Sequence, residues 1–182
     1  IVKPVEIGLL PKEIQEIENT KKKKNLFIKI VLPLVLQENN RILLDRKRLF
    51  VILNKNINTK SEKEWLKRKF KQYGVVNNDL PTLKVRMDII PTSLAIAQSA
   101  KETGWGTSRF AIEGNALFGQ WTWSGDGIKP AAADGDHKVM SFKVLKASVR
   151  AYQRNLNTHS SYREFRKARA IQRDNEGELN SL

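Results

Sequence analysis

Apolar residues recur at helical spacing over much of the first half of the chain. This pattern predicts a helix at 26–35, which Pro33 is expected to kink or break, and a second helix at 42–53 with basic residues on its opposite face. Residues 1–24 contain prolines, a glycine and a run of lysines. They therefore predict an arm with at most one short helix, at 12–20.

A third helix is predicted just beyond, because Ser61 and Glu64 have the spacing of a capping box that opens an apolar run. One more short helix is expected at 83–90. No combination of residues typical of catalysis occurs before this point. We therefore interpret residues 1–80 as a basic helical extension, an antiparallel pair of helices that packs on a domain formed by residues 81–182.

The stretch from Pro91 to Gly104 predicts a short helix with one apolar face, opened near the proline and ended by the glycine. Glu102 falls in its last turn, where the partial negative charge of the helix dipole lies. That charge, partial burial and the ring of Trp105 are all expected to raise the pKa of the Glu102 carboxyl group. A carboxyl group that stays protonated near neutral pH can act as a general acid. The alternative is a solvated glutamate at a frayed helix end.

The residues after this helix are rich in aromatic rings. Residues 104–123 contain three tryptophans and two phenylalanines, interleaved with glycines and with Asn115. Aromatic faces separated by small and amide residues suit a groove that stacks sugar rings and hydrogen-bonds their hydroxyl and acetamido groups. Ordinary core aromatics in a loop-rich turn are the alternative interpretation.

The chain carries three ordered blocks of sequence, A-Q-S-A-K-E-T-G-W-G-T-S-R-F, E-G-N-A-L-F-G-Q-W and N-L-N-T-H-S-S-Y-R-E-F-R. Together they resemble the Bax-like branch of the glucosaminidases, a group of flagellar and autolysin peptidoglycan hydrolases. The resemblance is close from Leu83 to Ala170. It implies a mainly α fold, in which a lysozyme-like α+β domain with a small β-lobe at 122–142 follows the helical extension.

The resemblance also implies a function. We expect a hydrolase that cleaves β-1,4 bonds of the peptidoglycan glycan strand, most simply as an endo-β-N-acetylglucosaminidase in which Glu102 protonates the leaving oxygen. Tyr162 matches the tyrosine of an Asn-Pro-x-Tyr-like family element and is expected opposite the acid. Five residues are expected to shape the substrate groove, and the phenylalanine among them is equally credible as core: Trp105, Asn115, Phe118, Gln120 and Trp121.

The second chemical group is harder to place. Many family members carry a glutamate in the β-lobe, whereas this sequence has none between Glu113 and Glu164. Either Asp134 or Asp136 substitutes, or the acetamido group of the substrate assists, or water is activated in another way. The Asp-Gly-Asp-His turn lacks the further spacing of a calcium loop, and neither histidine belongs to a zinc motif, so no metal or other cofactor is expected.

The net charge of +14, concentrated in the first 80 residues, favours an anionic neighbour such as the polymers of a cell envelope. Nucleic acid is not expected, because zinc-finger, helix-turn-helix and ribonucleoprotein motifs are absent. The sequence has no cysteine, no signal-peptide pattern and no apolar run of the length that a membrane span needs. A periplasmic or other cell-envelope location follows from the family alone.

Two other functions fit parts of the pattern. A lytic transglycosylase uses the same fold and one glutamate, and the missing lobe glutamate keeps this alternative open. A non-catalytic wall-binding module is the second alternative. Because the family usually continues with further helical sequence, we also expect the catalytic domain to be truncated at Leu182.

Overall fold

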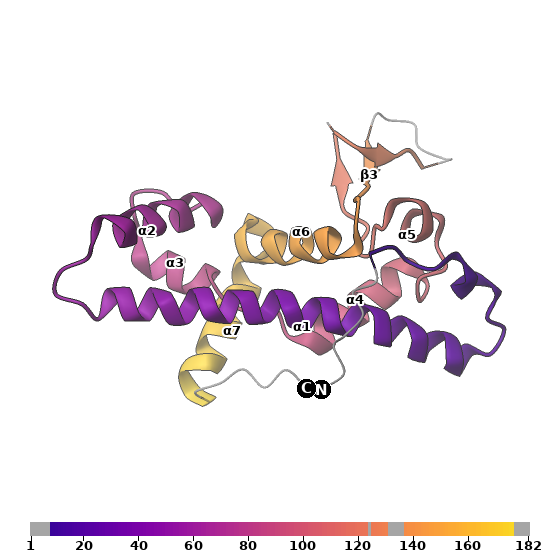
Figure 1. The fold of residues 1–182 in the computed structure, drawn as a ribbon, viewed down its shortest axis with the longest axis horizontal. Helices are drawn as coiled ribbons and strands as arrows, with labels where there is room; N and C mark the ends of the chain where they lie inside the picture. The colour runs from indigo at the N-terminus through magenta and orange to yellow at the C-terminus, as the bar shows by residue number, and fades with distance from the viewer. Residues whose placement is uncertain (1–7, 124, 131–136, 177–182) are drawn as a thin grey trace. The chain divides into compact units, whose positions relative to one another are not determined.

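The computed structural model describes residues 8–123, 125–130 and 137–176, and most of them are helical (Figure 1). A small three-stranded antiparallel sheet completes the described part, so the expected mainly α fold with a small β-lobe is confirmed. In chain order the elements are η1 (Lys12–Glu16), α1 (Thr20–Leu53), α2 (Lys60–Gln72), α3 (Leu80–Arg86), α4 (Thr92–Thr103), α5 (Arg109–Gly114), β1 (Trp121–Thr122), β2 (Gly127–Ile128), β3 (Lys138–Met140), α6 (Leu145–Thr158), η2 (Ser160–Tyr162) and α7 (Arg163–Glu176).

Helix α1 is 34 residues long and contains Pro33 in its interior. The two helices that the apolar pattern predicts in this region are therefore one, and the expectation that the helix could break at Pro33 is wrong. A proline inside a helix removes one backbone hydrogen bond and crowds the preceding turn, at a cost of about 3 kcal/mol. Val31 and Val35, on either side of it, are fully buried, and their burial offsets that cost.

Helix α2 opens on a capping box, but two residues earlier than expected. Thr59 Oγ1 accepts a hydrogen bond from the backbone N–H of Glu62 (3.3 Å), and the Glu62 carboxylate accepts one from the backbone N–H of Thr59 (2.9 Å). The hydrogen bond from Lys55 to that carboxylate, at 2.5 Å, is the main cause that lowers the pKa of Glu62 to about 2. The capping box thus forms between Thr59 and Glu62, and the expected pairing of Ser61 with Glu64 is wrong.

The chain forms two compact units, each built from segments that are distant in sequence. The first unit contains residues 1–37 and 92–152, and the second contains residues 38–91 and 153–182. Each unit thus takes residues from both sides of position 80. The division into a basic extension and a catalytic domain at that position stays a prediction.

In the first unit the core lies between the N-terminal part of α1, helix α4 and the start of α6. In the sheet, β3 is the central strand, and its Val139 pairs with Trp121 of β1 and with Ile128 of β2. Helix α5 lies next to the sheet (Figure 1). The buried apolar residues of this core include Phe27, Val31, Ala95, Leu117, Leu145 and Val149.

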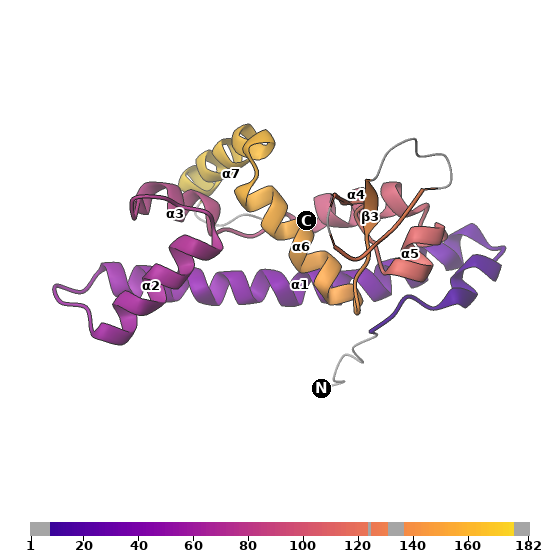
Figure 2. The ribbon, with the colours of Figure 1, turned by 90° about the horizontal axis from the view of Figure 1, so that it is seen from above.

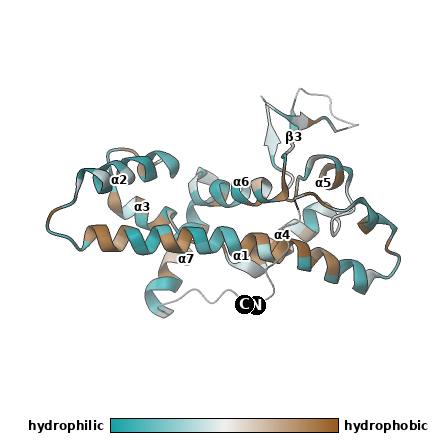
Figure 3. Cartoon of the chain, viewed as in Figure 1, coloured by the Kyte–Doolittle hydropathy of each residue, from teal (hydrophilic) through white to brown (hydrophobic). Residues whose placement is uncertain are grey.

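In the second unit a separate core joins the C-terminal part of α1 to α2 and α3. Its buried residues include Leu49, Ile52, Trp65, Phe70, Leu83 and Met87. Helix α3 lies beside α7 (Figure 2). Most residues of α2 are hydrophilic (Figure 3). None of the helices within the described residues is both long and apolar enough to span a membrane.

Arginines of α7 and a buried aspartate hold the second unit together. Asp88, only 2% exposed, accepts a hydrogen bond from Nε of Arg173 at 2.7 Å. Arg169, 3% exposed, donates through Nη1 to the carbonyl oxygen of Ile89 (2.7 Å) and to Oδ1 of Asn157 (2.8 Å). Removing one partner of such a buried network leaves an uncompensated polar or charged group, so these residues have a structural role.

Candidate active site

Glu102 lies in the last turn of α4, as predicted, because that helix ends one residue later. The three residues that follow the end of α4 all have positive φ angles, 57° at Gly104, 60° at Trp105 and 84° at Gly106. Glycine adopts this conformation freely, whereas a bulky residue does so only where its surroundings hold it. Thr103 closes the turn, since its Oγ1 accepts a hydrogen bond from the backbone N–H of Gly106 at 2.9 Å.

The ring of Trp105 is what fixes this turn to α1. It meets the ring of Phe27 edge-on, with 5.9 Å between centroids, and Nζ of Lys24 lies 4.9 Å from its centroid. At the next residue, a Cβ on Gly106 would come within 2.9 Å of the Phe27 ring. The spacing E-T-G-W-G therefore has a local physical reason. The role of Trp105 in shaping a substrate groove stays a prediction, because its half-buried ring already packs on α1.

The Glu102 side chain is exposed, so the partial burial expected from the sequence is wrong. Its carboxylate lies against Gly119, which has a φ of 56°. A Cβ on Gly119 would lie 2.9 Å from Oε2 of Glu102, closer than real Cβ atoms approach a neighbour. The absence of a side chain at position 119 therefore leaves the space that this carboxylate oxygen occupies.

Three side chains hold the Gly119 segment close to α4. Phe118 is stacked on Tyr152, with 3.8 Å between ring centroids and 7° between ring planes. The Tyr152 hydroxyl donates a hydrogen bond to Oε1 of Gln98, which lies one helical turn before Glu102. Phe118 and Tyr152 are 8% and 4% exposed. Phe118 thus belongs to the core, the second of the two roles expected for it, and it positions the residue that contacts the candidate acid.

The two amide residues predicted for the groove differ in what their side chains contact. Asn115 is buried, and both ends of its amide bond within the fold: Oδ1 accepts from the backbone N–H of Leu10 (3.3 Å), and Nδ2 donates to the carbonyl oxygen of Phe142 (2.9 Å). Its φ of 50° also makes it the left-handed cap that ends α5. Gln120, by contrast, has a buried Oε1 without a hydrogen-bond donor among the described residues. Asn115 therefore has a structural role.

Two exposed tryptophans form an aromatic surface on the β-lobe. Trp121 and Trp123 are 56% and 79% exposed, and the ring of His137 lies 4.6 Å from the first and 5.6 Å from the second, between centroids. Both indoles thus lie on the same side of the lobe. Exposed aromatic faces of this kind can stack on sugar rings. Trp121 was predicted as a groove residue, whereas Trp123 was counted only among the aromatic rings of residues 104–123 and His137 was given no binding role. The W-T-W alternation already places the two tryptophans on one face of a strand.

The remaining predicted residues lie elsewhere. Tyr162 belongs to the second unit, where it is half-buried and its ring lies 6.3 Å from that of His159. The turn before it is capped by Nδ1 of His159, which accepts from the backbone N–H of Ser161 at 3.3 Å. The position of Tyr162 opposite Glu102 stays a prediction. Asp134 and Asp136 lie outside the described residues.

Comparison with known proteins identifies the class. The model of the glucosaminidase family, described as mannosyl-glycoprotein endo-β-N-acetylglucosaminidase, matches residues 78–179. The chain therefore belongs to the glucosaminidase family. It is similar to Protein bax of Escherichia coli (strain K12), with 37% identity over 155 residues that cover 81% of this chain and 56% of that protein. The chain thus spans little more than half the length of that relative. No solved structure matches it.

Proposed function

We propose that this protein hydrolyses peptidoglycan, cleaving β-1,4 bonds of the glycan strand as an endo-β-N-acetylglucosaminidase with Glu102 as its general acid. The observation that carries the proposal is the exposed Glu102 carboxylate, seated against Gly119 at the end of α4. A general acid has to reach the glycosidic oxygen directly, and an accessible carboxyl group on the rigid end of a helix meets that condition. The supporting contacts from Gln98, Tyr152 and Phe118 keep Gly119 beside it.

In this reaction the Glu102 carboxyl group gives its proton to the leaving oxygen as the bond from that oxygen to the anomeric carbon breaks. A water molecule then forms the new bond to the anomeric carbon. It either attacks directly and gives its proton to the second group, or it displaces an internal nucleophile and gives its proton back to the Glu102 carboxylate. Trp121 and Trp123 would stack on sugar rings of the strand. Tyr162 would stabilise the positive charge that builds at the anomeric carbon.

The partner of the acid is one of three alternatives. Asp134 or Asp136 supplies the second carboxylate, or the acetamido oxygen of the substrate is the internal nucleophile, or water is activated in another way. An acetamido mechanism needs no carboxylate nucleophile from the protein, which agrees with the lack of a glutamate between Glu113 and Glu164. The proposed substrate also implies a periplasmic or cell-envelope location, where the excess of positive charge would attract anionic envelope polymers.

Digestion of purified peptidoglycan by the wild type and by Glu102→Gln, with released fragments identified by mass spectrometry, tests the proposal. We expect fragments that end in reducing N-acetylglucosamine from the wild type and none from the variant. Anhydro ends would assign the protein to the lytic transglycosylases instead. Wall binding by both proteins without release from either would indicate a binding module, and equal release by both would exclude Glu102 as the acid.

A further inference from the structure

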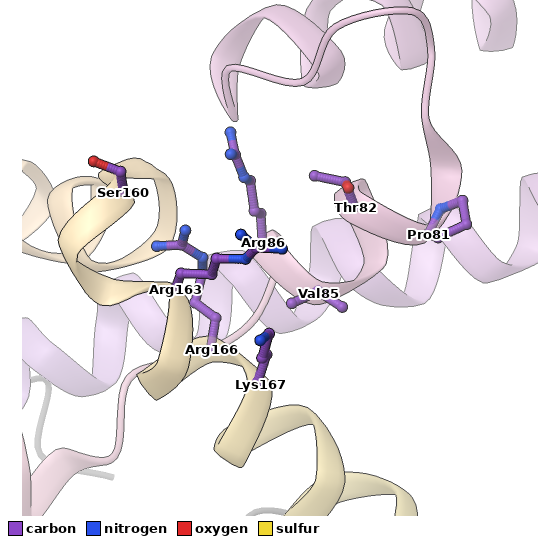
Figure 4. Close-up of a pocket in the computed structure, with 8 residues that line it drawn as sticks. All are labelled: Pro81, Thr82, Val85, Arg86, Ser160, Arg163, Arg166 and Lys167. Carbon is purple, nitrogen blue, oxygen red and sulfur yellow. The ribbon is translucent and has the colours of Figure 1, made fainter.

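The second unit contains a strongly basic pocket of about 530 Å³ (Figure 4). It lies between α3 and the segment formed by η2 and α7, and no carboxylate among the described residues lines it. Four cations do so, Arg86 from α3 and Arg163, Arg166 and Lys167 from α7. Figure 4 shows the three arginines gathered on one side of the pocket. None of these residues is used in the proposed bond cleavage.

Two of the cations are held in place by backbone carbonyl groups. Arg166 is only 4% exposed, and its Nη1 donates to the carbonyl oxygens of Leu156 (2.9 Å) and His159 (2.8 Å). Arg86 donates through Nη1 to two carbonyl oxygens in the turn after α2, both at 2.8 Å. Each guanidinium is thus fixed through a single nitrogen. Its other N–H groups have no acceptor among the described residues and are available to a ligand.

Glu164 offsets only part of the positive charge of this cluster, and the hydrogen bond from Lys167, followed by the charges of Lys167 and Arg163, lowers the pKa of its carboxyl group. Burial, followed by the charges of Arg86 and Arg163, lowers the pKa of Arg166, as expected for like charges held close together. Arg163 is exposed and has no hydrogen-bond acceptor or ion-pair partner among the described residues. Lys167 pairs with Glu164 at 2.9 Å, but both side chains are more than half exposed, and such a pair contributes little.

Other arginines of the same helix show what a purely structural arrangement looks like. Arg169 and Arg173 also lie on α7, and both are paired with the buried carboxylate of Asp88. A structural cluster would be expected to contain such a counter-charge, because unpaired cations at close range repel one another. The cluster around Arg166 has no counter-charge of this kind, so an external anion is the missing partner.

The apolar part of the lining narrows the kind of anion. Pro81 and Val85 of α3 form another wall of the pocket (Figure 4). A guanidinium fork matches the planar geometry of a carboxylate, and an apolar wall accommodates a short aliphatic chain. A carboxylate on an aliphatic stem, as in an acidic amino acid residue, fits both features. Free inorganic phosphate would use only the first.

We propose that this pocket binds a side-chain carboxylate of an acidic peptide, which on the substrate of the proposed function is the peptide stem attached to the glycan strand. The identity of the stem rests on that proposed function, whereas the affinity for an acidic peptide does not. Arg163 and Lys167 are the cations that the ligand reaches first, because both are exposed.

Calorimetric titration of the full chain with N-acetyl-Ala-Glu amide tests the pocket directly, since its only charge is the side-chain carboxylate. We expect the wild type to bind it, and to bind the neutral N-acetyl-Ala-Gln amide at least ~10-fold more weakly. The variant that combines Arg163→Gln with Lys167→Gln should also bind the acidic peptide at least ~10-fold more weakly. Inorganic phosphate is titrated in parallel.

The matched control combines Arg68→Gln with Lys71→Gln. Both residues are exposed on α2 of the same unit. Their replacement removes two positive charges, as the pocket variant does, but at positions that do not line the pocket. This control should change the affinity for the acidic peptide less than ~2-fold, because neither residue lines the pocket and salt screens exposed surface charges. The proposal is overturned if the wild type does not bind the peptide, if the control weakens binding as much as the pocket variant, or if phosphate binds more tightly than the peptide.

Hydrolysis assays separate this inference from the proposed function. Soluble glycan strands are compared with and without their peptide stems, which an amidase removes. The Arg163→Gln, Lys167→Gln variant should raise KM about 10-fold on strands that carry stems and leave kcat and KM unchanged on stripped strands. Equal effects on both substrates contradict the pocket inference. Unimpaired hydrolysis by Glu102→Gln contradicts the proposed acid and leaves the peptide titration unaffected.

Discussion

Replacing Gly119 by alanine tests whether Glu102 acts from the position that the structure shows. The new Cβ would lie 2.9 Å from Oε2 of Glu102, whereas ordinary van der Waals contact begins at 3.4 Å. The carboxylate oxygen therefore has to move by about 0.5 Å or more. Because it ends a flexible and exposed side chain, this movement costs little stability. It does displace the oxygen that is proposed to give the proton.

The size of the effect follows from how sharply catalysis depends on geometry. A misplacement of about 1 Å can cost ~100-fold in rate, so a shift of half that size should lower kcat about 10-fold. The positive φ of 56° at position 119 adds a stability cost of about 1–2 kcal/mol for any residue with a Cβ. We therefore expect Gly119→Ala to lower kcat about 10-fold and to decrease the free energy of unfolding by about 1–2 kcal/mol.

Gly74→Ala is the matched control for the backbone strain. Gly74 has a φ of 61°, and its Cβ would meet only the end of the Arg86 side chain, at 3.3 Å. Both variants should lose similar free energy of unfolding in urea titrations, but only Gly119→Ala should lose kcat. The assay uses glycan strands without peptide stems, so that Arg86 does not influence the result. Full activity of Gly119→Ala, or equal loss in Gly74→Ala, would refute the reasoning.

Three further predictions concern other parts of the fold. Burial raises the pKa of Tyr73 to about 12, so the folded state favours the neutral phenol. The contribution of Tyr73 to the free energy of unfolding should be fully present below pH 10, and the free energy should fall by about 2–3 kcal/mol as the pH rises towards 12. Tyr73→Phe should remove this part of the alkaline loss in urea titrations, and identical pH profiles would contradict the shift. Replacing both Trp121 and Trp123 by alanine should raise KM for glycan strands about 10-fold, because stacking on the sugar rings is lost. The melting temperature should not change, because both rings are exposed. An unchanged KM would exclude sugar stacking at these two residues. Asp88→Asn should destabilise the protein by about 3–5 kcal/mol, because it leaves the buried Arg169 and the partly buried Arg173 without their counter-charge. A loss below about 1 kcal/mol in chemical denaturation would show that the network is dispensable.

The elements that the sequence predicts well are those set by neighbouring residues. The short helix at α4 and its end before Gly104 follow from local periodicity and a turn residue, whereas the small β-lobe was expected from the family resemblance. Pro33 shows the limit of such rules. By local rules it should end the helix, but the burial of Val31 and Val35 stabilises α1 on both sides of it. The grouping into two units is likewise not local, since each unit joins segments from both ends of the chain.

The candidate site divides in the same way. Local reasoning placed Glu102 in the last turn of its helix, but it could not give the exposure of the side chain, which depends on what packs over that turn. Asn115 looked like a residue for sugar hydroxyls because its type is suited to them, yet its amide is already bonded to two backbone groups far away in sequence. Nothing in the sequence around Gly119 indicates its role. The residue matters because its lack of a side chain leaves the space that the Glu102 carboxylate occupies.

The exposure of Glu102 has a consequence for the proposed reaction. An acid in a preorganised site is most effective when water is excluded from it, because charges and dipoles then act in a low dielectric. Because the free protein leaves this carboxyl group open to solvent, the exclusion of water has to come from the bound glycan. A sugar ring stacked on Trp121, two residues after Gly119, would provide such a surface. Loss of the indole rings would then lower kcat as well as raise KM for long strands. If the rings contribute only to affinity, their loss would raise KM alone. Measuring both kinetic parameters distinguishes these outcomes.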